Sequence, residues 1–311
     1  MSQTTSERPR VFLIDGYSNI FRAYYAIRDL SSSKGEPTNA VFGFLNMLRK
    51  LLRDEAPKYL GVAFDVSSDT HRRDQFADYK ANRAPMPEDL RPQVPWIRKL
   101  LEAYKIPILE QHKYEADDVL GTLARKAVAA GFDVVLLSPD KDLMQLVDEH
   151  VFVYHTRREK LYDAKEVEAE WGVPPARVAD VLALMGDSSD NVPGVPGIGR
   201  KGAEQLVREY GSVEQLLERA GEISRKAYRE GLQEHREQAL QSKELVTIHT
   251  EVPVEFEPEQ LVLDEPDWPA LLELCRELDF TSLVKEIEAQ HAAPAEPVAE
   301  TEVVTTAAVW R

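Results

Sequence analysis

Cysteine, long apolar runs and excess basic charge are all scarce in this sequence. The only cysteine is Cys275, inside the apolar pattern LLELCRELDF, so a disulfide within the chain is excluded and a buried structural thiol is the simplest interpretation. No apolar run approaches the roughly 20 residues of a membrane span, and residues 1–9 (MSQTTSERP) lack the apolar segment of a signal peptide. These absences predict a globular protein of a reducing cytoplasm that does not enter membranes.

The shortage of basic residues bears directly on nucleic-acid binding. The chain has 54 acidic and 38 basic residues, a net charge of -16, whereas proteins that bind nucleic acids usually carry a basic face. Net charge alone therefore predicts no such binding. The prediction changes if the acidic residues gather around metal ions, because bound cations neutralise them. Local basic segments would then have to supply the contacts with phosphates.

Strand-like and helix-like segments alternate in the first half of the chain. Three apolar segments, 11–15, 59–65 and 134–140, each end in an aspartate and are predicted to be buried strands. Helical patterns cover 38–53, 88–104 and 115–130. This alternation predicts a doubly wound, mainly parallel α/β sheet. Ligands of such sheets bind at the carboxyl ends of the strands, so Asp15, Asp65 and Asp140 should meet in one crevice.

The second half of the chain has a different pattern. Beyond Tyr162, short helical segments separated by glycine and proline predict a helical subdomain over residues 163–288. Residues 289–311 are rich in Ala, Pro, Glu, Thr and Val without a period, which predicts a disordered tail or linker. Residues 1–9 are also expected to be disordered. The α/β core then occupies residues 10–162.

Further acidic residues accompany the three at the strand ends. Each small group alone is better explained by helix capping or turn formation. Clustered carboxylates, however, repel one another unless they are protonated or bind metal. Oxygen ligands without matching His or Cys favour Mg²⁺ or Mn²⁺ over Zn²⁺. The number of acids predicts two ions, the arrangement that hydrolyses phosphodiesters. The candidate ligands are Asp15, Asp65, Glu115, Asp117, Asp118, Asp140, Asp142, Asp187 and Asp190.

Two segments carry features suited to DNA. The segment THRRDQFADYKANR mixes Arg72, Lys80 and Arg83 with aromatic residues such as Tyr79, as in channels that bind single-stranded DNA. A solvated loop would be the preferred interpretation if the acids were absent. Residues 194–201 (GVPGIGRK) join two helices through a glycine hairpin, as in a helix-hairpin-helix. Its glycines let backbone N–H groups approach a phosphate, and a lysine adds charge.

Together these segments resemble a known family. FLIDGYSNIFRAYYA, VAFD, FADYKANRAPMPEDLRPQ, YEADDVLGTLA, SPDKDLMQLV and ALMGDSSDNVPGVPGIGRKGAEQL follow, in order, the 5′ nuclease domain of bacterial DNA polymerase I and its flap-endonuclease relatives, over residues 11–288. The resemblance implies a PIN-like 5′ nuclease core with a helical arch around residues 66–92, followed by a helix-hairpin-helix subdomain. It implies a metal-dependent 5′ to 3′ exonuclease or flap endonuclease that cuts near the 5′ end of nicked, flapped or primer-bearing DNA in replication and repair.

The resemblance also implies roles for single residues. The first metal site would involve Asp15, Asp65, Glu115, Asp117 and, as a further candidate, Asp118; the second would involve Asp140, Asp142, Asp187 and Asp190, and the division between the sites stays open. Lys80 and Arg72 would contact the scissile phosphate, with Arg22 near it. DNA would be bound by Tyr79, Arg83, Gly194, Gly197, Gly199 and Lys201, and the helix-hairpin-helix can bind K⁺. Gly202 departs from the pattern, because many relatives carry a hydroxyl residue there.

Two other classes of protein fit less well. A catalytically inactive DNA-binding module would have lost some of the acids, and none is missing. A phosphatase of the haloacid-dehalogenase kind needs an acid where Tyr17 stands, and a receiver domain would end before residue 163. We therefore expect a monomer of the bacterial cytoplasm and nucleoid whose partners are DNA, RNA–DNA primers and a DNA polymerase in cis or in trans. Whether the chain works alone or is a fragment of DNA polymerase I stays open, as do its metal and its exonuclease or endonuclease preference.

Overall fold

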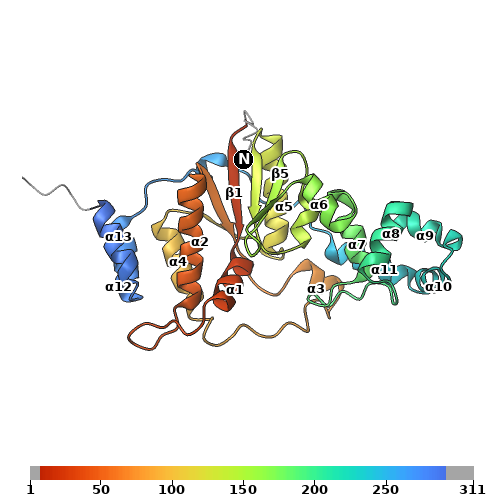
Figure 1. Ribbon diagram of the computed structural model, residues 1–311, viewed down its shortest axis with the longest axis horizontal. Coiled ribbons are helices and arrows are strands. Elements are labelled where there is room, and N and C mark those ends of the chain that lie inside the picture. The colour runs from red at the N-terminus through yellow and green to blue at the C-terminus, as the bar shows by residue number, and fades with distance from the viewer. Residues whose placement is uncertain (1–7, 292–311) are drawn as a thin grey trace, which may run out of the picture.

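The computed structural model describes residues 8–291, and at its centre lies one mainly parallel sheet (Figure 1). The strand order is β3-β2-β1-β4-β5-β6, and all neighbours are parallel except β5 and β6, which are antiparallel. This confirms the predicted doubly wound α/β sheet. The strands are β1 (Arg10–Asp15), β2 (Tyr59–Ala63), β3 (Ile108–Leu109), β4 (Asp133–Leu137), β5 (Val151–His155) and β6 (Lys160–Tyr162).

Both faces of the sheet are buried, because helices cover each of them, and alternate side chains of a strand point to opposite faces. Phe12 and Ile14 of β1 face α1 (Gly16–Ala26), α2 (Asn39–Glu55) and α4 (Gln93–Ala103). Val11 and Leu13 face α5 (Ala116–Ala129). Burial on both faces explains why the strands are continuous apolar runs. It also leaves the ends of the strands as the place where polar residues can gather.

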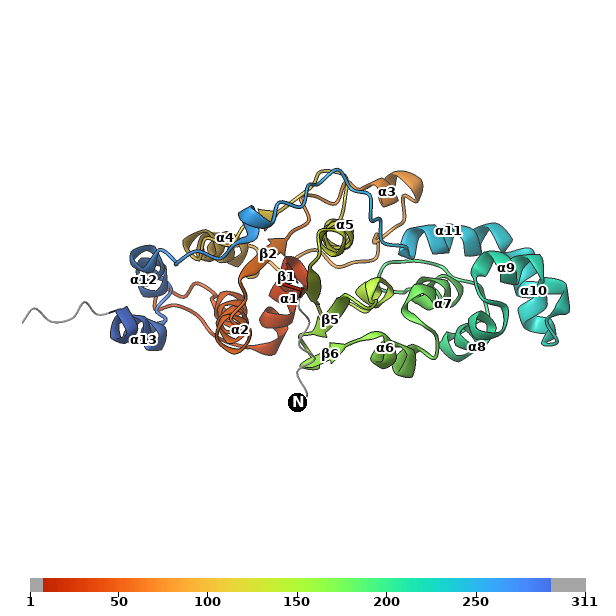
Figure 2. The same cartoon turned by 90° about the horizontal axis from the view of Figure 1, so that it is seen from above.

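The helical subdomain extends to one side of the sheet (Figure 2). Its helices are α6 (Ala164–Trp171), α7 (Val178–Met185), α8 (Arg200–Tyr210), α9 (Val213–Glu218), α10 (Lys226–Glu234) and α11 (Arg236–Val246). The described residues also contain four 3₁₀ helices: η1 (Asp142–Leu146), η2 (Pro175–Arg177), η3 (Ala220–Glu222) and η4 (Pro258–Leu261). After α11 the chain returns along α5 as residues 247–257, which we call the returning segment.

The last two helices, α12 (Trp268–Glu277) and α13 (Thr281–His291), belong to the α/β core. They lie at the opposite end of the molecule from α8, α9 and α10 in both views. Leu271, Cys275 and Leu283 are buried in one cluster with Leu45 and Leu48 of α2. The prediction of a single helical subdomain over 163–288 is therefore wrong, because the apolar faces of these helices cover α2 and α4.

The predicted ends of the ordered chain also need adjustment. Helix α13 continues to residue 291, and the rest of the predicted tail lies outside the described residues, as do residues 1–7. Residues 8 and 9 are placed, since the carbonyl of Pro9 accepts a hydrogen bond from the N–H of Asp133 at 2.9 Å. Within residues 8–291, no helix is both long and apolar enough to cross a membrane.

Residues 66–92, which we call the arch segment, contain only one short helix, α3 (His71–Gln75). The prediction of a helical arch is wrong for the rest of the segment. Lys80 has a φ of 56°, in the left-handed region, and its N–H donates to the carbonyl of Asp190 at 2.9 Å. Pro85 and Pro87 lack the N–H that a helix needs. The arch segment is therefore mostly turns and extended chain that close over the carboxyl end of the sheet.

Candidate active site

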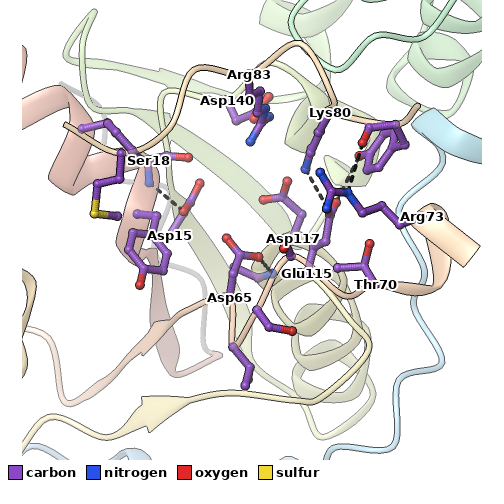
Figure 3. A pocket seen from close by; sticks show the side chains of 18 residues that line it. Asp15, Ser18, Asp65, Thr70, Arg73, Lys80, Arg83, Glu115, Asp117 and Asp140 are labelled. Atoms are coloured by element: carbon purple, nitrogen blue, oxygen red, sulfur yellow. Dashed lines mark hydrogen bonds and ion pairs between the residues drawn. The ribbon is translucent and has the colours of Figure 1, made fainter. Parts of the chain in front are cut away.

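A cavity of about 420 Å³ lies at the carboxyl ends of β1 and β2. The arch segment contributes basic side chains to one wall, and α1 contributes Tyr17 and Phe21 to another. Figure 3 shows the acidic side chains around a common space. The acids that line it are Asp15, Asp65, Glu115, Asp117 and Asp140. Five of the nine predicted ligands therefore share one cavity, as the strand topology predicts for three of them.

Asp15 and Asp65 are positioned by the turns that follow their strands. Asp15 caps α1, accepting from the N–H of Ser18 at 3.1 Å, and its second oxygen accepts from Ser138 Oγ at 2.7 Å. Burial raises the pKa of Asp15 to about 6, and the charges of Asp140 and Asp65 also raise it, although the two hydrogen bonds act in the opposite direction. Asp65 Oδ1 accepts from the N–H of Ala116 at 2.8 Å, which joins β2 to the start of α5. Burial likewise raises the pKa of Asp65.

Glu115 and Asp117 enter the cavity from the start of α5. Glu115 Oε1 accepts from Lys80 Nζ at 2.8 Å, and Oε2 lies 3.1 Å from the hydroxyl of Tyr79. Burial raises the pKa of Asp117 well above its usual value, and the negative charges of Asp140 and Asp15 raise it further. Ionised Asp117 is therefore disfavoured unless a cation is close.

Asp142, Asp187 and Asp190 form a second acidic group beside Asp140. Asp140 Oδ1 accepts from the N–H of Asp142 at 2.9 Å. Burial and the charge of Asp140 raise the pKa of Asp142 well above its usual value. Burial would raise the pKa of Asp187, but hydrogen bonds from Lys141 and a serine outweigh it, and the pKa falls. Asp140 therefore lies between the two acidic groups and interacts with both.

The donor set of these two groups fits divalent metal ions. All the donors are carboxylate oxygens, which suit Mg²⁺ or Mn²⁺. Asp142 Oδ1 is buried and has no hydrogen-bond partner in the described part of the chain; its nearest cation is Lys141 Nζ at 3.8 Å. Among residues 8–291, however, no three His, Cys, Asp or Glu side chains converge closely enough to hold an ion as they stand. Binding would require rotation of carboxylates that now contact Lys80 or Lys141.

Asp118 and Arg72 do not face the cavity, and the structure corrects both assignments. Asp118 is fully buried and forms two hydrogen bonds of 2.7 Å with Arg72. Arg72 is 2% exposed, so it does not reach over the site. Asp117 and Asp118 are neighbours on a helix, where successive side chains diverge by roughly 100°, and the sequence alone did not separate them. Arg73, from the same basic segment, lines the cavity together with Lys80 and Arg83.

Tyr79 and Arg22 also differ from prediction. Tyr79 lines the cavity but is only 3% exposed, with its ring in the core, so too little of the ring is free for a base to stack on it. Its hydroxyl lies 3.1 Å from Glu115 and 3.3 Å from Asp190. Arg22 lines a separate cavity of about 650 Å³ behind α1, which also contains Glu159.

Lys141 is a residue that the sequence prediction missed. It lies between two candidate ligands in the motif SPDKD, and its ammonium group forms an ion pair with Asp187. Such a lysine partly neutralises the second acidic group. In the sequence Lys141 stands between Asp140 and Asp142, and a search for acidic residues alone does not consider it.

The glycines of the hairpin before α8 have different roles. Gly197 has a φ of 83°, and neither Gly197 nor Gly199 has an atom within 4 Å of an added Cβ, so both remain open to a close ligand. A Cβ on Gly194 would lie 2.3 Å from the backbone of Gly186, so internal packing requires this glycine. Lys201 is exposed in the first turn of α8. The arrangement can present N–H groups and a cation to a phosphate.

Gly202, the departure noted in the sequence, is explained by packing. A Cβ on Gly202 would lie 2.4 Å from the hydroxyl oxygen of Tyr228. The ring of Tyr228 stacks against the guanidinium of Arg225 at 4.0 Å, and Arg225 donates to its hydroxyl at 2.7 Å. A tyrosine hydroxyl from α10 therefore lies where a side chain of residue 202 would begin.

Comparisons with known proteins cover most of the chain. Residues 10–172 match the family model "5′-3′ exonuclease, N-terminal resolvase-like domain", and residues 173–269 match "5′-3′ exonuclease, C-terminal SAM fold". A 5′-3′ exonuclease from Aquifex aeolicus is 41% identical over 89% of this chain and 95% of its own length. DNA polymerase I from Rhizobium leguminosarum is 43% identical over 89% of this chain, which spans 28% of that polymerase.

Solved structures share the fold at lower identity. The bacteriophage T5 flap endonuclease, in a complex with DNA and metal ions, matches with a TM-score of 0.66 and 20% identity, over 90% of this chain and 100% of that one. The catalytic core of Rad2 in complex with a DNA substrate matches with a TM-score of 0.62 and 16% identity, over 91% and 92%. At these identities the matches show a shared fold.

Proposed function

Because the chain belongs to the 5′-3′ exonuclease family, we propose that it is a divalent-metal-dependent 5′ nuclease that hydrolyses phosphodiester bonds near the 5′ end of nicked or flapped DNA. The observation that carries the proposal is the convergence of two acidic groups at the carboxyl end of the sheet, under a basic arch segment. Cleavage would leave a 5′-phosphate and a 3′-hydroxyl.

Eight carboxylates would hold two Mg²⁺ or Mn²⁺ ions. When bound, the two ions supply hydroxide from bound water and stabilise the leaving oxygen. Asp140 interacts with both acidic groups, which suits a ligand near both ions. The proposed ligands are Asp15, Asp65, Glu115, Asp117, Asp140, Asp142, Asp187 and Asp190.

Lys80 and Arg83 would contact the scissile phosphate from the arch segment. Lys80 Nζ lies 2.8 Å from Glu115 and 3.7 Å from Asp190, at the wall between the two acidic groups. Arg83 is more exposed and also contacts Asp190. With the carboxylates held by metal ions, Lys80 and Arg83 would donate hydrogen bonds to phosphate oxygens, on which negative charge develops in the transition state.

The duplex would be held by the helix-hairpin-helix. Gly197, Gly199 and Lys201 offer open backbone and a positive charge at the start of α8, features that bind phosphates without reading sequence. K⁺ would bind at the same hairpin. In this proposal the helical subdomain fixes the duplex while the cavity receives the scissile phosphate.

The biological role would be removal of flaps or RNA–DNA primers in DNA replication and repair. A DNA polymerase is the proposed partner, because several relatives are DNA polymerase I and the chain spans only 28% of the Rhizobium enzyme. The likeness to an exonuclease over 95% of its length is equally compatible with a nuclease that acts separately, as a monomer.

The test is cleavage of a 5′-labelled double-flap DNA with and without Mg²⁺, using the full chain and Asp117→Ala. We expect Mg²⁺-dependent release of the flap that is lost in the variant. Asp264→Ala is the control. It removes an exposed aspartate that does not line the cavity, and the variant should cut normally. Tight flap binding without cleavage in Mg²⁺ or Mn²⁺ would overturn the proposal and favour a DNA-binding module.

A further inference from the structure

One buried guanidinium, that of Arg72, connects three parts of the molecule. An arginine has five N–H donors, and all five of Arg72 are used. Nε donates to the carbonyl of Leu245 at 2.9 Å, Nη1 donates to Glu115 at 3.2 Å and Asp118 at 2.7 Å, and Nη2 donates to Asp118 at 2.7 Å and the carbonyl of Thr247 at 2.8 Å. The arch segment, the start of α5 and the end of α11 therefore meet at this side chain.

The connection lies where the helical subdomain rejoins the core. Leu245 is in the last turn of α11, and Thr247 begins the returning segment. Asp118, which holds Arg72 with both oxygens, also accepts from the N–H of His249 at 2.9 Å. Gln75 of α3 donates to Glu244 of α11 at 2.7 Å, which is a second contact between the arch segment and α11. The end of α11 is thereby fixed to both the arch segment and α5.

The same guanidinium reaches a side chain that lines the cavity. Glu115 Oε2 accepts from Arg72 and lies beside the hydroxyl of Tyr79, while Oε1 accepts from Lys80. Arg72 itself is too buried to touch DNA. Any effect of Arg72 on cleavage must therefore pass through Glu115 or through the placement of α11.

We propose that Arg72 is a positioning residue that sets which phosphodiester is cut. It fixes the duplex-holding helical subdomain relative to the carboxylates of the cavity, so that bound DNA enters in one register. The inference rests on the proposed nuclease function. A displacement of about 1 Å at a reacting centre can cost roughly 100-fold in rate. Loosening the contacts of Arg72 with α5 and the end of α11, which we call the joint, should therefore affect both the site of cleavage and its rate.

Two variants probe the joint without opening a large cavity. Arg72→Lys keeps the positive charge but lacks the planar fork that holds Asp118 and two carbonyls. Asp118→Asn is isosteric and weakens the same contact from the other side, at a residue that does not line the cavity. Lys126→Met is the matched control. Lys126 is also on α5 and holds the returning segment, through the carbonyl of Val254 at 2.6 Å. It lies in the last turn of α5, at the opposite end of the helix from Asp118.

The measurement is single-turnover cleavage of a flap DNA in saturating Mg²⁺, with products resolved to single nucleotides, well below each variant's melting temperature. We expect Arg72→Lys to cut at several adjacent positions and about 10- to 100-fold more slowly, with the Kd for the flap DNA changed far less than the single-turnover rate constant. Asp118→Asn should broaden the products in the same way, and Lys126→Met should cut at the wild-type position.

Three outcomes would overturn the inference. Cleavage by Arg72→Lys at the wild-type position alone, whether slow or fast, would indicate an effect through Glu115 alone or a purely structural role. Normal products from Asp118→Asn would separate Asp118 from the joint. Broad products from Lys126→Met would assign register to the returning segment as a whole. If the wild-type chain does not cleave, the proposed function fails as well, whereas normal wild-type cleavage confines the failure to this inference.

Discussion

Asp15→Asn should stabilise the protein when no divalent metal is present and the pH is neutral or higher. Asp15 is 3% exposed, and its pKa rises from 3.8 to about 6. At about 1.4 kcal/mol per pKa unit, ionised Asp15 disfavours folding by about 3 kcal/mol. Asparagine removes the charge but keeps an oxygen for only one of the two hydrogen bonds. We therefore expect a net gain on the order of 1–3 kcal/mol.

The raised pKa also determines how the free energy of unfolding changes with pH. Folded Asp15 binds its proton more tightly than the unfolded chain does, so its contribution to stability is full below pH 3.8 and is lost as the pH rises through about 6. Wild-type protein and Asp15→Asn should therefore differ little near pH 4 and most above pH 7. Asp117 and Asp142 have pKa values shifted in the same direction, so a pH dependence remains in the variant.

The assay is thermal and urea unfolding in a metal chelator, at several pH values, followed by the same series in Mg²⁺. The expected gain corresponds to a rise in Tm of about 2–6 °C for a chain of this size. Mg²⁺ should then stabilise the wild type more than the variant. Asp264→Asn, at an exposed position, is the control and should change neither series. A metal-free Asp15→Asn protein that is less stable than wild type at pH 8 would refute the reasoning.

Three further predictions concern the rest of the molecule. Lys80→Ala should slow single-turnover cleavage by about 100-fold while duplex affinity changes little, and Lys201→Ala should do the reverse; equal effects on both quantities would remove this division. Gly202→Ser should cost about 1 kcal/mol in unfolding experiments because it meets the Tyr228 hydroxyl at 2.4 Å, and Tyr228→Ala should relieve the cost. Leu283→Ala should destabilise the protein by about 2–5 kcal/mol without altering duplex affinity, because α13 packs on the core rather than on the helical subdomain; an unchanged Tm would contradict this placement.

Much of the fold and part of the site could be read from the sequence. Apolar runs ending in aspartate identified β1, β2 and β4, and parallel topology alone brought Asp15, Asp65 and Asp140 to one edge. The short strands β3 and β6 gave no usable pattern, because two or three residues show no periodicity. The sequence also placed residues 268–288 in a helical subdomain, but a helical pattern does not say which neighbour an apolar face will cover.

The parts of the site that the sequence did not predict depend on which way a side chain points and on which group it contacts. Asp117 and Asp118 have the same chemistry, yet one lines the cavity and the other is held by a buried guanidinium. For the same reason Arg72, which was predicted to face the site, is buried, whereas its neighbour Arg73 lines the cavity. Composition reports which groups are available. Only the packing of α3 against α5 and α11 decides which of them reaches solvent.

The return of the chain to the core after α11 has a consequence for how the protein is made. Helix α2 is synthesised early, but α12 and α13 that cover it come more than 200 residues later, with ring contacts such as Phe42 to Phe280 at 5.2 Å. During translation the part of α2 around Phe42 therefore stays uncovered until the helical subdomain has been synthesised. Closing so long a loop costs more entropy than forming the local contacts of α2. We therefore expect this contact to form late, and a nascent chain halted before residue 268 to expose apolar surface that chaperones bind.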